Sequence, residues 1–565
     1  MAMESEKTAP QRMPRHSTAW NALCAHLATM RDLHIRDLFL ADPDRGSRFC
    51  IEAAGWYLDY SKNRITFDTL ELLVLLAREN CLPARIEAMF NGDAVNVSEG
   101  RAALHVALRM PACFSLPVAG TDVIPIVQGV LAGMERFTDA LRDGACLGAT
   151  GRPIRNVVNI GIGGSSLGVG MACAALQHYS RRDMTFRFIS NVDGTDFAEA
   201  TRDLDPRETL FVVCSKTFHT METLENAQSA RAWCQAAIPL GRAWPAHFVA
   251  VTGNREAAAA FGVLPDRIFD VWDWVDGRYS LCSAMGLVLM AAIGARAFRE
   301  MLAGFHDMDL HFRYAPLERN MPVLHGLISV WNNNFLGSRS VAVLPYDHYL
   351  RRFPSYIQQL MMESNGKSVT QCGAPANCHT GPVYWGASGT NGQHSFYQLL
   401  HQGSQIVPCD FIGFLEPLRP PRTHHDELMA NLFAQAEALS FGRGQEGAEI
   451  LRGASETDAH RHVEGNRPSN TLLARRLSPA TLGALMALYE HSAFTQGVIW
   501  NIDSFDQWGV ELGKVLASRI ARELQAGEIN AQAHDSSTRN LMSRLLAAKH
   551  EALQERRREG GGPAA

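Results

Sequence analysis

Two segments rich in hydroxyl side chains have the composition of a phosphate-binding site. They are NIGIGGSSLG (159–168) and CSKTFHTMET (214–223), and each includes or follows an apolar run of strand length. A phosphate monoester presents several strong acceptor oxygens, which hydroxyls, an ammonium group and the free N–H groups at a helix start can satisfy. Ser and Thr are also common helix N-caps, but two such segments at the carboxyl edge of one predicted sheet favour phosphate. The candidate side chains are Ser165, Ser215, Lys216, Thr217 and Thr220.

Two charged residues further along the chain could stabilise and move charge. Arg278, in WDWVDGRYSLCSAMG (272–286), carries a fixed positive charge that suits a developing oxyanion. A structural ion pair at a domain junction is an equally open interpretation of this arginine. Glu363, in MMESNGK (361–367), is predicted at the end of a helix, where the helix dipole disfavours a carboxylate. A residue placed against local preference is mild evidence of function, although most such glutamates are simply solvated.

A histidine and a lysine complete the candidate set. In GTNGQHSFYQLLHQG (389–403), His394 is predicted in the first turn of a short helix. The positive end of that helix would keep the imidazole neutral and able to pass a proton either way. In FDQWGVELGK (505–514), a helix would place three polar side chains on one face, namely Gln507, Glu511 and Lys514. A surface or packing histidine and an exposed Glu–Lys pair are the alternative interpretations.

The elements around these segments indicate an α/β protein. Short apolar runs alternate with segments long enough for crossover helices, which is typical of doubly wound parallel sheets. Residues 348–362 are expected to form a helix with one apolar face. The expected strands are 157–163, 185–192, 209–215, 246–253 and 266–272 in a first series, and 340–346 and 404–414 in a second.

The chain is long enough for several structural units, because its 565 residues exceed what one core can fill. We expect a helical N-terminal region, two doubly wound α/β domains with parallel-rich sheets, and a C-terminal helical arm. The charged and Gly-rich tail, 555–565, is expected to be disordered. The expected boundaries are 1–115, 116–295, 296–520 and 521–565.

Composition argues against several classes of function. The net charge of −5 provides no overall basic field for nucleic acid or an anionic membrane. The longest apolar run, 284–295, is too short to span a bilayer, and the N-terminus lacks the apolar region of a signal peptide. None of the 12 cysteines forms a C-x-x-C motif. We therefore expect a reducing, cytoplasmic location and neither a metal nor a cofactor.

A nicotinamide oxidoreductase is the weakest alternative. The dinucleotide fingerprint is met at Gly161 and Gly163, but Ser166 stands at its third glycine. Asp193 also lies later in the chain than the usual ribose-binding acid. A P-loop is absent, because the Gly-Lys-Ser at 366–368 lacks the upstream glycine.

Taken together, these segments resemble the glucose-6-phosphate isomerase (phosphoglucose isomerase) family. The family-like motifs run in order from about residue 155 to 514, and their joint presence is very specific. They are GIGGSSLG, SKTFHTMET, DGRYSLCSAMG, ESNGK, GTNGQH, EGNRPSN and FDQWGVELGK. The resemblance implies two sugar-isomerase domains and a homodimer with active sites at the subunit interface. It also implies reversible conversion of D-glucose 6-phosphate to D-fructose 6-phosphate through a cis-enediol, as in glycolysis and gluconeogenesis.

The resemblance further implies a role for each candidate residue. Glu363 would be the base that moves the proton, and Arg278 would stabilise the enediolate. His394, donated by the partner subunit, would open the sugar ring together with Lys514. The residues that would bind the phosphosugar substrate are Gly164, Ser165, Ser215, Lys216, Thr217, Thr220 and Gln507.

Two departures from the family pattern leave rate and affinity open. Asp276 stands where the family usually has a glycine, and Ala387-Ser388 stand where Glu-Pro are common. Neither departure removes a residue assigned to chemistry. A phosphosugar-binding regulator on the same fold would need the hydroxyl segments but not the three proton-moving residues together, so their joint presence favours an enzyme.

Overall fold

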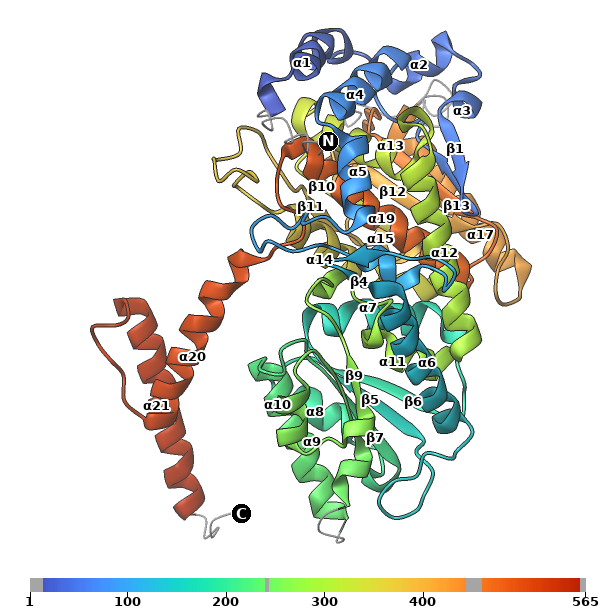
Figure 1. The fold of residues 1–565 in the computed structure, drawn as a ribbon. Helices are drawn as coiled ribbons and strands as arrows, with labels where there is room; N and C mark the ends of the chain where they lie inside the picture. The colour runs from blue at the N-terminus through green and yellow to red at the C-terminus, as the bar shows by residue number, and fades with distance from the viewer. Residues whose placement is uncertain (1–13, 239–242, 444–459, 559–565) are drawn as a thin grey trace, which may run out of the picture. The chain divides into compact units, whose positions relative to one another are not determined.

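The computed structural model describes residues 14–238, 243–443 and 460–558 (Figure 1). The chain divides into an N-terminal unit, Met1–Asp506, and a C-terminal unit, Gln507–Ala565. Both parallel-rich sheets belong to the N-terminal unit and carry helices on their faces, so the predicted α/β fold class is confirmed.

The first sheet contains the strands expected between residues 155 and 272, paired in parallel in the order β6-β5-β7-β8-β9. Side chains alternate between its faces, so Phe211 and Val213 pack on the side of α8, α9 and α10. Val212 and Cys214 face the side of α6, α7 and α11. The strands are β5 (Asn156–Ile160), β6 (Thr185–Ile189), β7 (Thr209–Cys214), β8 (Phe248–Thr252) and β9 (Ile268–Asp270). The helices are α6 (Val123–Arg142), α7 (Leu167–Ala175), α8 (Gly194–Thr201), α9 (Met221–Ala237), α10 (Arg255–Phe261) and α11 (Leu287–Ile293).

The second sheet has the order β1-β2-β13-β12-β10-β11, and its strands β10 and β12 confirm the two expected from the sequence. The N-terminal region, expected to be helical with little strand signal, also contains the β1–β2 hairpin, in which β2 pairs antiparallel with β13. Each hairpin strand is only four residues long and includes an acidic residue, which leaves no apolar run of strand length. The strands are β1 (Cys50–Ala53), β2 (Trp56–Asp59), β10 (Ser340–Pro345), β11 (Val383–Trp385), β12 (Cys409–Phe414) and β13 (Ser469–Ala474), with a separate small hairpin of β3 (Pro117–Val118) and β4 (Thr121–Asp122).

One buried helix, α19 (Pro479–Trp500), joins the two α/β layers. It packs against α12, α13 and α14, and the hydrophobic cluster that contains it also contains residues of both sheets. The layers therefore share one core. The other helices around this core are α1 (Thr18–Met30), α2 (Ile35–Ala41), α3 (Arg45–Arg48), α4 (Phe67–Glu79), α5 (Leu82–Asn91), α12 (Ala295–Tyr314), α13 (Met321–Val330), α15 (Gly389–Gln393), α16 (Tyr397–Gln402) and α17 (Arg422–Phe441).

The helix expected over residues 348–362 consists of a 3₁₀ turn, His348–Arg352, followed by α14 (Phe353–Asn365). Glu363 lies in the last turn of α14, and Gly366 is the C-cap, as the sequence predicts. The apolar face of the segment is buried through Leu350, Phe353, Ile357, Leu360 and Met361. This burial fixes the orientation of α14 and thereby the direction in which Glu363 points.

The C-terminal unit is helical, with α20 (Glu511–Ala526) and α21 (Ser536–Arg558). Because α21 extends to Arg558, the expectation of disorder is wrong for the start of the tail 555–565, and residues 559–565 lie outside the described residues. Apolar side chains are exposed on α20, including Leu512 and Val515. In the described part of the chain, no helix combines the length and the apolar character that a bilayer crossing needs.

Candidate active site

Three loops meet at the carboxyl edge of the first sheet. Ile160 of β5 lies opposite Val213 of β7 in a parallel pair, so the loops after these strands start side by side, as the sequence predicts. The loop after β9 joins them where Gly164 packs on Gly277. A Cβ added at Gly164 would lie 2.1 Å from the carbonyl carbon of Gly277, so this close approach requires glycine. Whether Gly164 also contacts substrate stays a prediction.

The hydroxyls of the first two loops are not used for helix capping. Thr220 occupies the N-cap position of α9 but makes no capping hydrogen bond, and its Oγ1 lies 3.3 Å from Ser215 Oγ. Ser165 ends a 3₁₀ turn just before α7, whose N-cap likewise lacks a side-chain hydrogen bond. Thr217 is exposed at the tip of its loop. The capping interpretation of these residues therefore does not explain them.

Lys216 connects the second loop to the third. Its Nζ donates hydrogen bonds to the carbonyl oxygens of Asp273 at 2.8 Å and Val275 at 3.0 Å. Burial lowers the pKa of the Lys216 ammonium. In this arrangement Lys216 positions the segment that leads into Arg278, and its predicted contact with phosphate stays a prediction.

Arg278 and Glu363 form the centre of the site. The Arg278 side chain is fully buried and donates from Nε to Ser364 Oγ at 2.7 Å and from Nη2 to the carbonyl oxygens of Ser504 and Asp506 at 2.5 and 3.2 Å. Its Nη1 lies 3.7 Å from Glu363 Oε2, and the Glu363 side chain is 21% exposed. That distance is too long for a hydrogen bond but short enough for strong electrostatic attraction.

The Glu363 carboxylate also faces the glycine-rich loop. Its Oε2 accepts a hydrogen bond from Gln359 Nε2 at 3.0 Å, and the same Nε2 would lie 3.3 Å from a Cβ placed on Gly163. The last two turns of α14 therefore border the loop that follows β5. The structure thus brings the candidate base, the candidate cation and the hydroxyl-rich edge into one region.

Asp276 introduces a buried carboxyl beside this region. Its Oδ1 lies 3.2 Å from Nη2 of Arg101, and its side chain is 7% exposed. Burial raises the pKa of the Asp276 carboxyl to about 6, against the opposing charges of Arg278, Arg101 and Lys216. The departure at this position thus adds a titratable group next to the candidate oxyanion cation.

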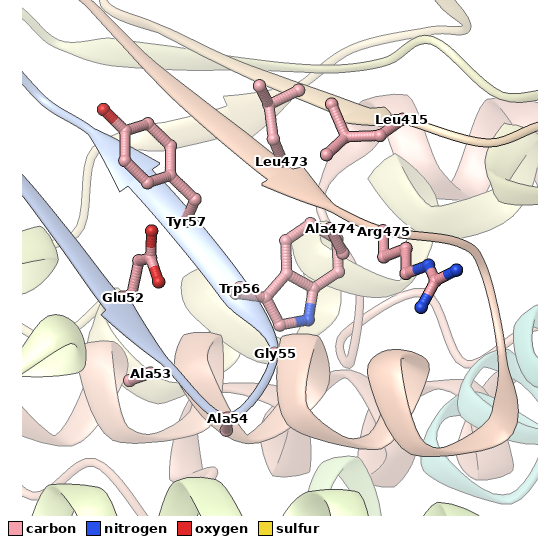
Figure 2. Close-up of a pocket in the computed structure, with 10 residues that line it drawn as sticks. All are labelled: Glu52, Ala53, Ala54, Gly55, Trp56, Tyr57, Leu415, Leu473, Ala474 and Arg475. Carbon is pink, nitrogen blue, oxygen red and sulfur yellow. The ribbon is translucent and has the colours of Figure 1, made fainter.

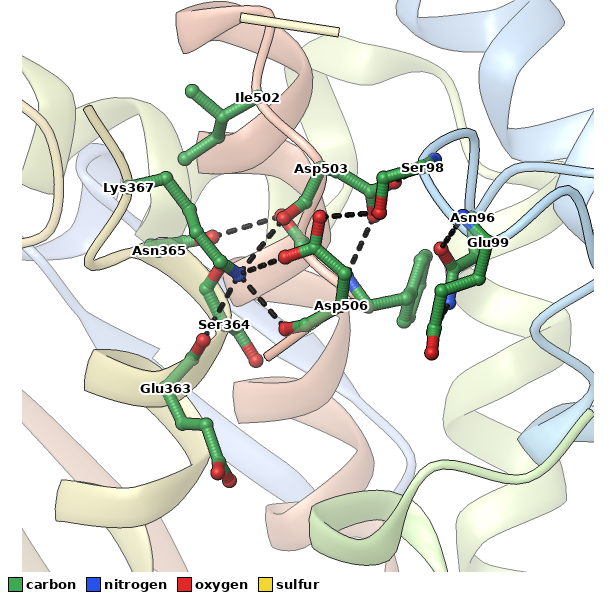
Figure 3. A network of polar contacts seen from close by, with 12 residues as sticks. Asn96, Ser98, Glu99, Glu363, Ser364, Asn365, Lys367, Ile502, Asp503 and Asp506 are labelled. Atoms are coloured by element: carbon green, nitrogen blue, oxygen red, sulfur yellow. Dashed lines mark hydrogen bonds and ion pairs between the residues drawn. The ribbon is translucent and has the colours of Figure 1, made fainter. Parts of the chain in front are cut away.

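Sequence reasoning missed Lys367, which is the centre of a polar network next to Glu363 (Figure 3). Its Nζ lies 2.9–3.0 Å from the carbonyl oxygens of Glu363, Ser364, Asp503 and Asp506 and 3.1 Å from Asp506 Oδ1. Burial lowers the pKa of this ammonium. The Glu363 side chain points away from it (Figure 3). A lysine directly after a helix C-cap was the available signal, since such side chains often bind the last helix carbonyls.

Three further predicted residues are described by their local structure alone. His394 is the exposed C-cap of α15, so its expected place in a first helical turn is wrong, and the argument from a positive helix end fails with it. Gln507 precedes a 3₁₀ turn and has a backbone that is not helical, so it does not share a helix face with Glu511 and Lys514. The latter two form the expected i, i+3 pair on α20, 2.7 Å apart. Gln507 and Lys514 belong to the C-terminal unit.

Asp193 and a hollow at the second sheet are not part of the candidate active site. Asp193, the candidate ribose-binding acid, caps α8 by accepting a hydrogen bond from the N–H of Thr195 at 3.0 Å. A hollow of about 610 Å³ lies at the second sheet, between the β1–β2 hairpin and Leu415, Leu473 and Arg475 (Figure 2). None of the candidate catalytic residues lines it. Among the described residues, no group of three or more His, Cys, Asp or Glu side chains is arranged to bind a metal ion.

The fold and the site together define a class, the doubly wound α/β isomerases of sugar phosphates. The comparisons agree with this class, since the phosphoglucose isomerase family profile matches residues 59–542. The chain belongs to the phosphoglucose isomerase family.

Named relatives share most of their length with this chain. A glucose-6-phosphate isomerase of Roseiflexus castenholzii is 59% identical over 534 residues, which cover 94% of this chain and 98% of the relative. One from Anaeromyxobacter dehalogenans is 60% identical over 532 residues, covering 94% and 97%. The crystal structure of a glucose-6-phosphate isomerase from Chlamydia trachomatis has a TM-score of 0.82 at 33% identity and covers 95% of this chain and 100% of that one.

Proposed function

We propose that the protein catalyses the reversible isomerisation of D-glucose 6-phosphate to D-fructose 6-phosphate, a step of glycolysis and gluconeogenesis. The observation that carries the proposal is the Glu363 carboxylate beside the buried Arg278 guanidinium, 3.7 Å away, next to the hydroxyl-rich edge of the first sheet. Membership of the family and the names of its relatives give the substrate.

Glu363 is the proton carrier in this mechanism. Its carboxylate removes the proton from C2 of the open aldose, and the electron pair moves into the C1–C2 bond while the carbonyl oxygen takes the negative charge. The proton of the C2 hydroxyl passes to O1 by way of the cis-enediol. The same carboxyl group then returns its proton to C1 as the electron pair of O2 forms the carbonyl at C2. One base can serve both carbons because they are adjacent and held in place.

Arg278 stabilises the oxygen on which charge develops. Its guanidinium is fixed before the reaction by a hydroxyl and two main-chain carbonyl groups, so it needs little reorganisation when the enediolate forms.

The phosphate of the substrate binds at the edge of the first sheet. Three observations support this placement. The hydroxyl of Thr220 makes no helix-capping hydrogen bond, Ser215 lies beside it, and the loop that contains Ser165 leads into α7. Binding energy from this remote group fixes the reacting carbons over Glu363. We extend the proposal to Lys216, Thr217 and Gln507 as substrate-binding residues on the strength of the resemblance.

Ring opening requires a second pair of groups, for which we propose His394 and Lys514. His394 is exposed at the end of α15, which suits a residue donated to the site of a partner subunit. The exposed apolar residues of α20, including Leu512 and Val515, support a homodimer. A cytoplasmic location is proposed because the 12 cysteines are all free thiols.

The test is exchange of the C2 hydrogen with solvent in the Glu363→Gln variant. We expect turnover of glucose 6-phosphate in a coupled assay to fall by about 10²–10⁴-fold, and exchange in deuterated water to fall with it. Binding of the phosphosugar, followed by calorimetry, is expected to persist because the hydroxyl-rich edge is unchanged.

The matched control is Glu416→Gln, which removes an exposed carboxylate that pairs with Arg475 at 2.9 Å. Its turnover is expected to equal that of the wild type. Undiminished exchange in Glu363→Gln would refute the role of Glu363, and a wild type that binds the phosphosugar without turnover would indicate a regulator.

A further inference from the structure

A second hollow, which we call the arginine pocket, lies between α7, β6 and the 3₁₀ turn before α14. It has a volume of about 390 Å³, which is within the range of small-molecule sites. Four arginines line it, in two sequence pairs. They are Arg181 and Arg182 before β6, and Arg351 and Arg352 before α14. None of the residues placed at the candidate active site lines this pocket.

The pocket carries more positive charge than its own acidic residues neutralise. Arg181 pairs with Asp183 at 2.8 Å. Among the described residues, Arg182, Arg351 and Arg352 have no carboxylate within ion-pair distance. Like charges that line one small pocket repel one another unless an anion lies between them. The chain as a whole has a net charge of −5, so this positive charge is confined to the surroundings of the pocket.

The positive field continues beyond the rim of the pocket. The pKa of His178 is lowered by burial and by Arg419, Arg182 and Arg476. The Nδ1 atom of this histidine is buried without a hydrogen-bond partner. The surroundings thus add the positive charges of Arg419 and Arg476, while Asp143 adds a negative charge near Arg181.

An aromatic wall faces the guanidinium groups. Phe186 and Phe188 alternate on β6 and so point to the same face. The absence of a side chain at Gly170 keeps the space open, because a Cβ there would lie 3.5 Å from Arg352 Nη1 and 3.7 Å from the Phe188 ring. Arginine forks suit phosphate oxygens, and a phenyl face suits a planar ring.

We propose that the arginine pocket binds a small molecule with a diphosphate group, one phosphate against each arginine pair. A nucleoside diphosphate would place its base against Phe186 and Phe188, whereas bare pyrophosphate would use the guanidinium groups alone. The pocket is distinct from the isomerase site, so this inference does not depend on the proposed isomerisation.

The test is calorimetric titration of the full-length protein with ADP and with inorganic pyrophosphate. The Arg182→Gln/Arg351→Gln double variant changes exposed side chains and is expected to lower the affinity for both probes by about tenfold or more. The Arg202→Gln/Arg296→Gln variant makes the same change of charge at exposed sites elsewhere, and its affinity is expected to equal that of the wild type. Tighter binding of ADP than of pyrophosphate would assign the aromatic wall to the base.

A steric variant gives an independent check. Gly170→Leu fills the space between Arg352 and Phe188 and is expected to abolish binding of both probes, whereas Gly170→Ala is expected to weaken it less. Isomerase turnover of each variant verifies that the chain is folded. Absence of probe binding to the wild type, equal loss in both double variants, or displacement of ADP by glucose 6-phosphate would overturn the proposal.

Discussion

Arg109 and Arg278 are both fully buried, yet their surroundings differ in charge. Arg109 donates to both carboxylate oxygens of Asp309 at 2.6 and 2.7 Å and to Glu490 at 2.7 Å. Arg278 is bound by a hydroxyl and by main-chain carbonyl groups, and the Glu363 carboxylate lies 3.7 Å from it.

The difference separates a structural cation from a candidate catalytic one. Two short carboxylate contacts compensate the charge of Arg109, and this cluster ties α12 to α19. Arg278 donates to a hydroxyl and to main-chain carbonyl groups, and its ion pair with Glu363 is longer, at 3.7 Å, which suits a cation that stabilises a developing oxyanion. Burial and geometry alone do not distinguish the two arginines; the charge of their partners does.

Substitution of Arg109 is expected to have the largest effect, and on stability. Arg109→Met leaves Asp309 and Glu490 buried without their cation, which should lower the free energy of unfolding by about 3–5 kcal/mol. Denaturant unfolding measures the loss, and turnover per folded molecule should stay close to that of the wild type. If Arg109→Met has the stability of the wild type but a low turnover, Arg109 acts in catalysis and not in stability.

Arg278→Lys should show the opposite pattern. The lysine keeps the charge but not the planar fork, so we expect kcat to fall by about 10²–10³-fold with a much smaller change in KM. Steady-state kinetics measures both. Arg187→Lys, which alters an ion pair with Asp203 on the surface, is the control. If kcat in Arg278→Lys equals that of the control, Arg278 does not stabilise the transition state.

Asp276 lies near Arg278, and its titration makes the stability of this region depend on pH. Its folded pKa of about 6 lies above the ordinary value of 3.8, so the native state binds this proton more tightly than the unfolded state. Stability is therefore lost as the pH rises from about 4 to 6. Removing the ionisable group in Asp276→Asn should raise the free energy of unfolding at pH 8 by roughly 2–3 kcal/mol relative to the wild type and leave it similar at pH 4.

Melting temperatures of both proteins across this range provide the measurement. The two curves are expected to converge near pH 4, to separate between about pH 4 and 6, and to stay apart at higher pH. Parallel curves would mean that Asp276 does not titrate in this window in the folded protein.

Lys514 adds a third, exposed cation, with the smallest expected effect on stability. Its pair with Glu511 is more than half exposed at the lysine, so Lys514→Met should change the free energy of unfolding by less than about 0.5 kcal/mol. If Lys514 assists ring opening, turnover of the closed sugar should nevertheless fall by about tenfold or more. Equal turnover in Lys514→Met and the wild type would remove Lys514 from the mechanism.

Much of the first sheet was predictable because β5, β7 and β8 are buried along almost their whole length and read as apolar runs. The second sheet was harder. Strand β13 includes Asn470, whose side chain bonds to Asp410 at 2.8 Å and accepts a hydrogen bond from Asn63 at 2.8 Å. Polar residues that find partners inside the protein interrupt the apolar pattern, and the partners come from distant parts of the chain.

Some features of the candidate site could likewise be predicted from the sequence, and others could not. The identity of Glu363 and Arg278, and the helix end that carries Glu363, could be predicted from local sequence. The helix assignment of His394 could not, because α15 ends at Gln393, one residue before it. Boundaries of such short helices depend on packing, here of Gly389 and Gln393 against Tyr346, rather than on local preference.

The sequence by itself determined which chemical groups are present, the strands of the first sheet that carry the hydroxyl-rich loops, and the family to which they belong. Local patterns suffice for this, because strand burial, loop composition and helix ends depend on neighbouring residues. Only the tertiary structure decided that Gly164 packs on Gly277, that Lys367 binds carbonyl groups from two segments, and that Arg109 has short bonds to two carboxylates whereas the Glu363 carboxylate lies 3.7 Å from Arg278. Each of these depends on contacts between residues far apart in the chain, whose distances no local pattern contains.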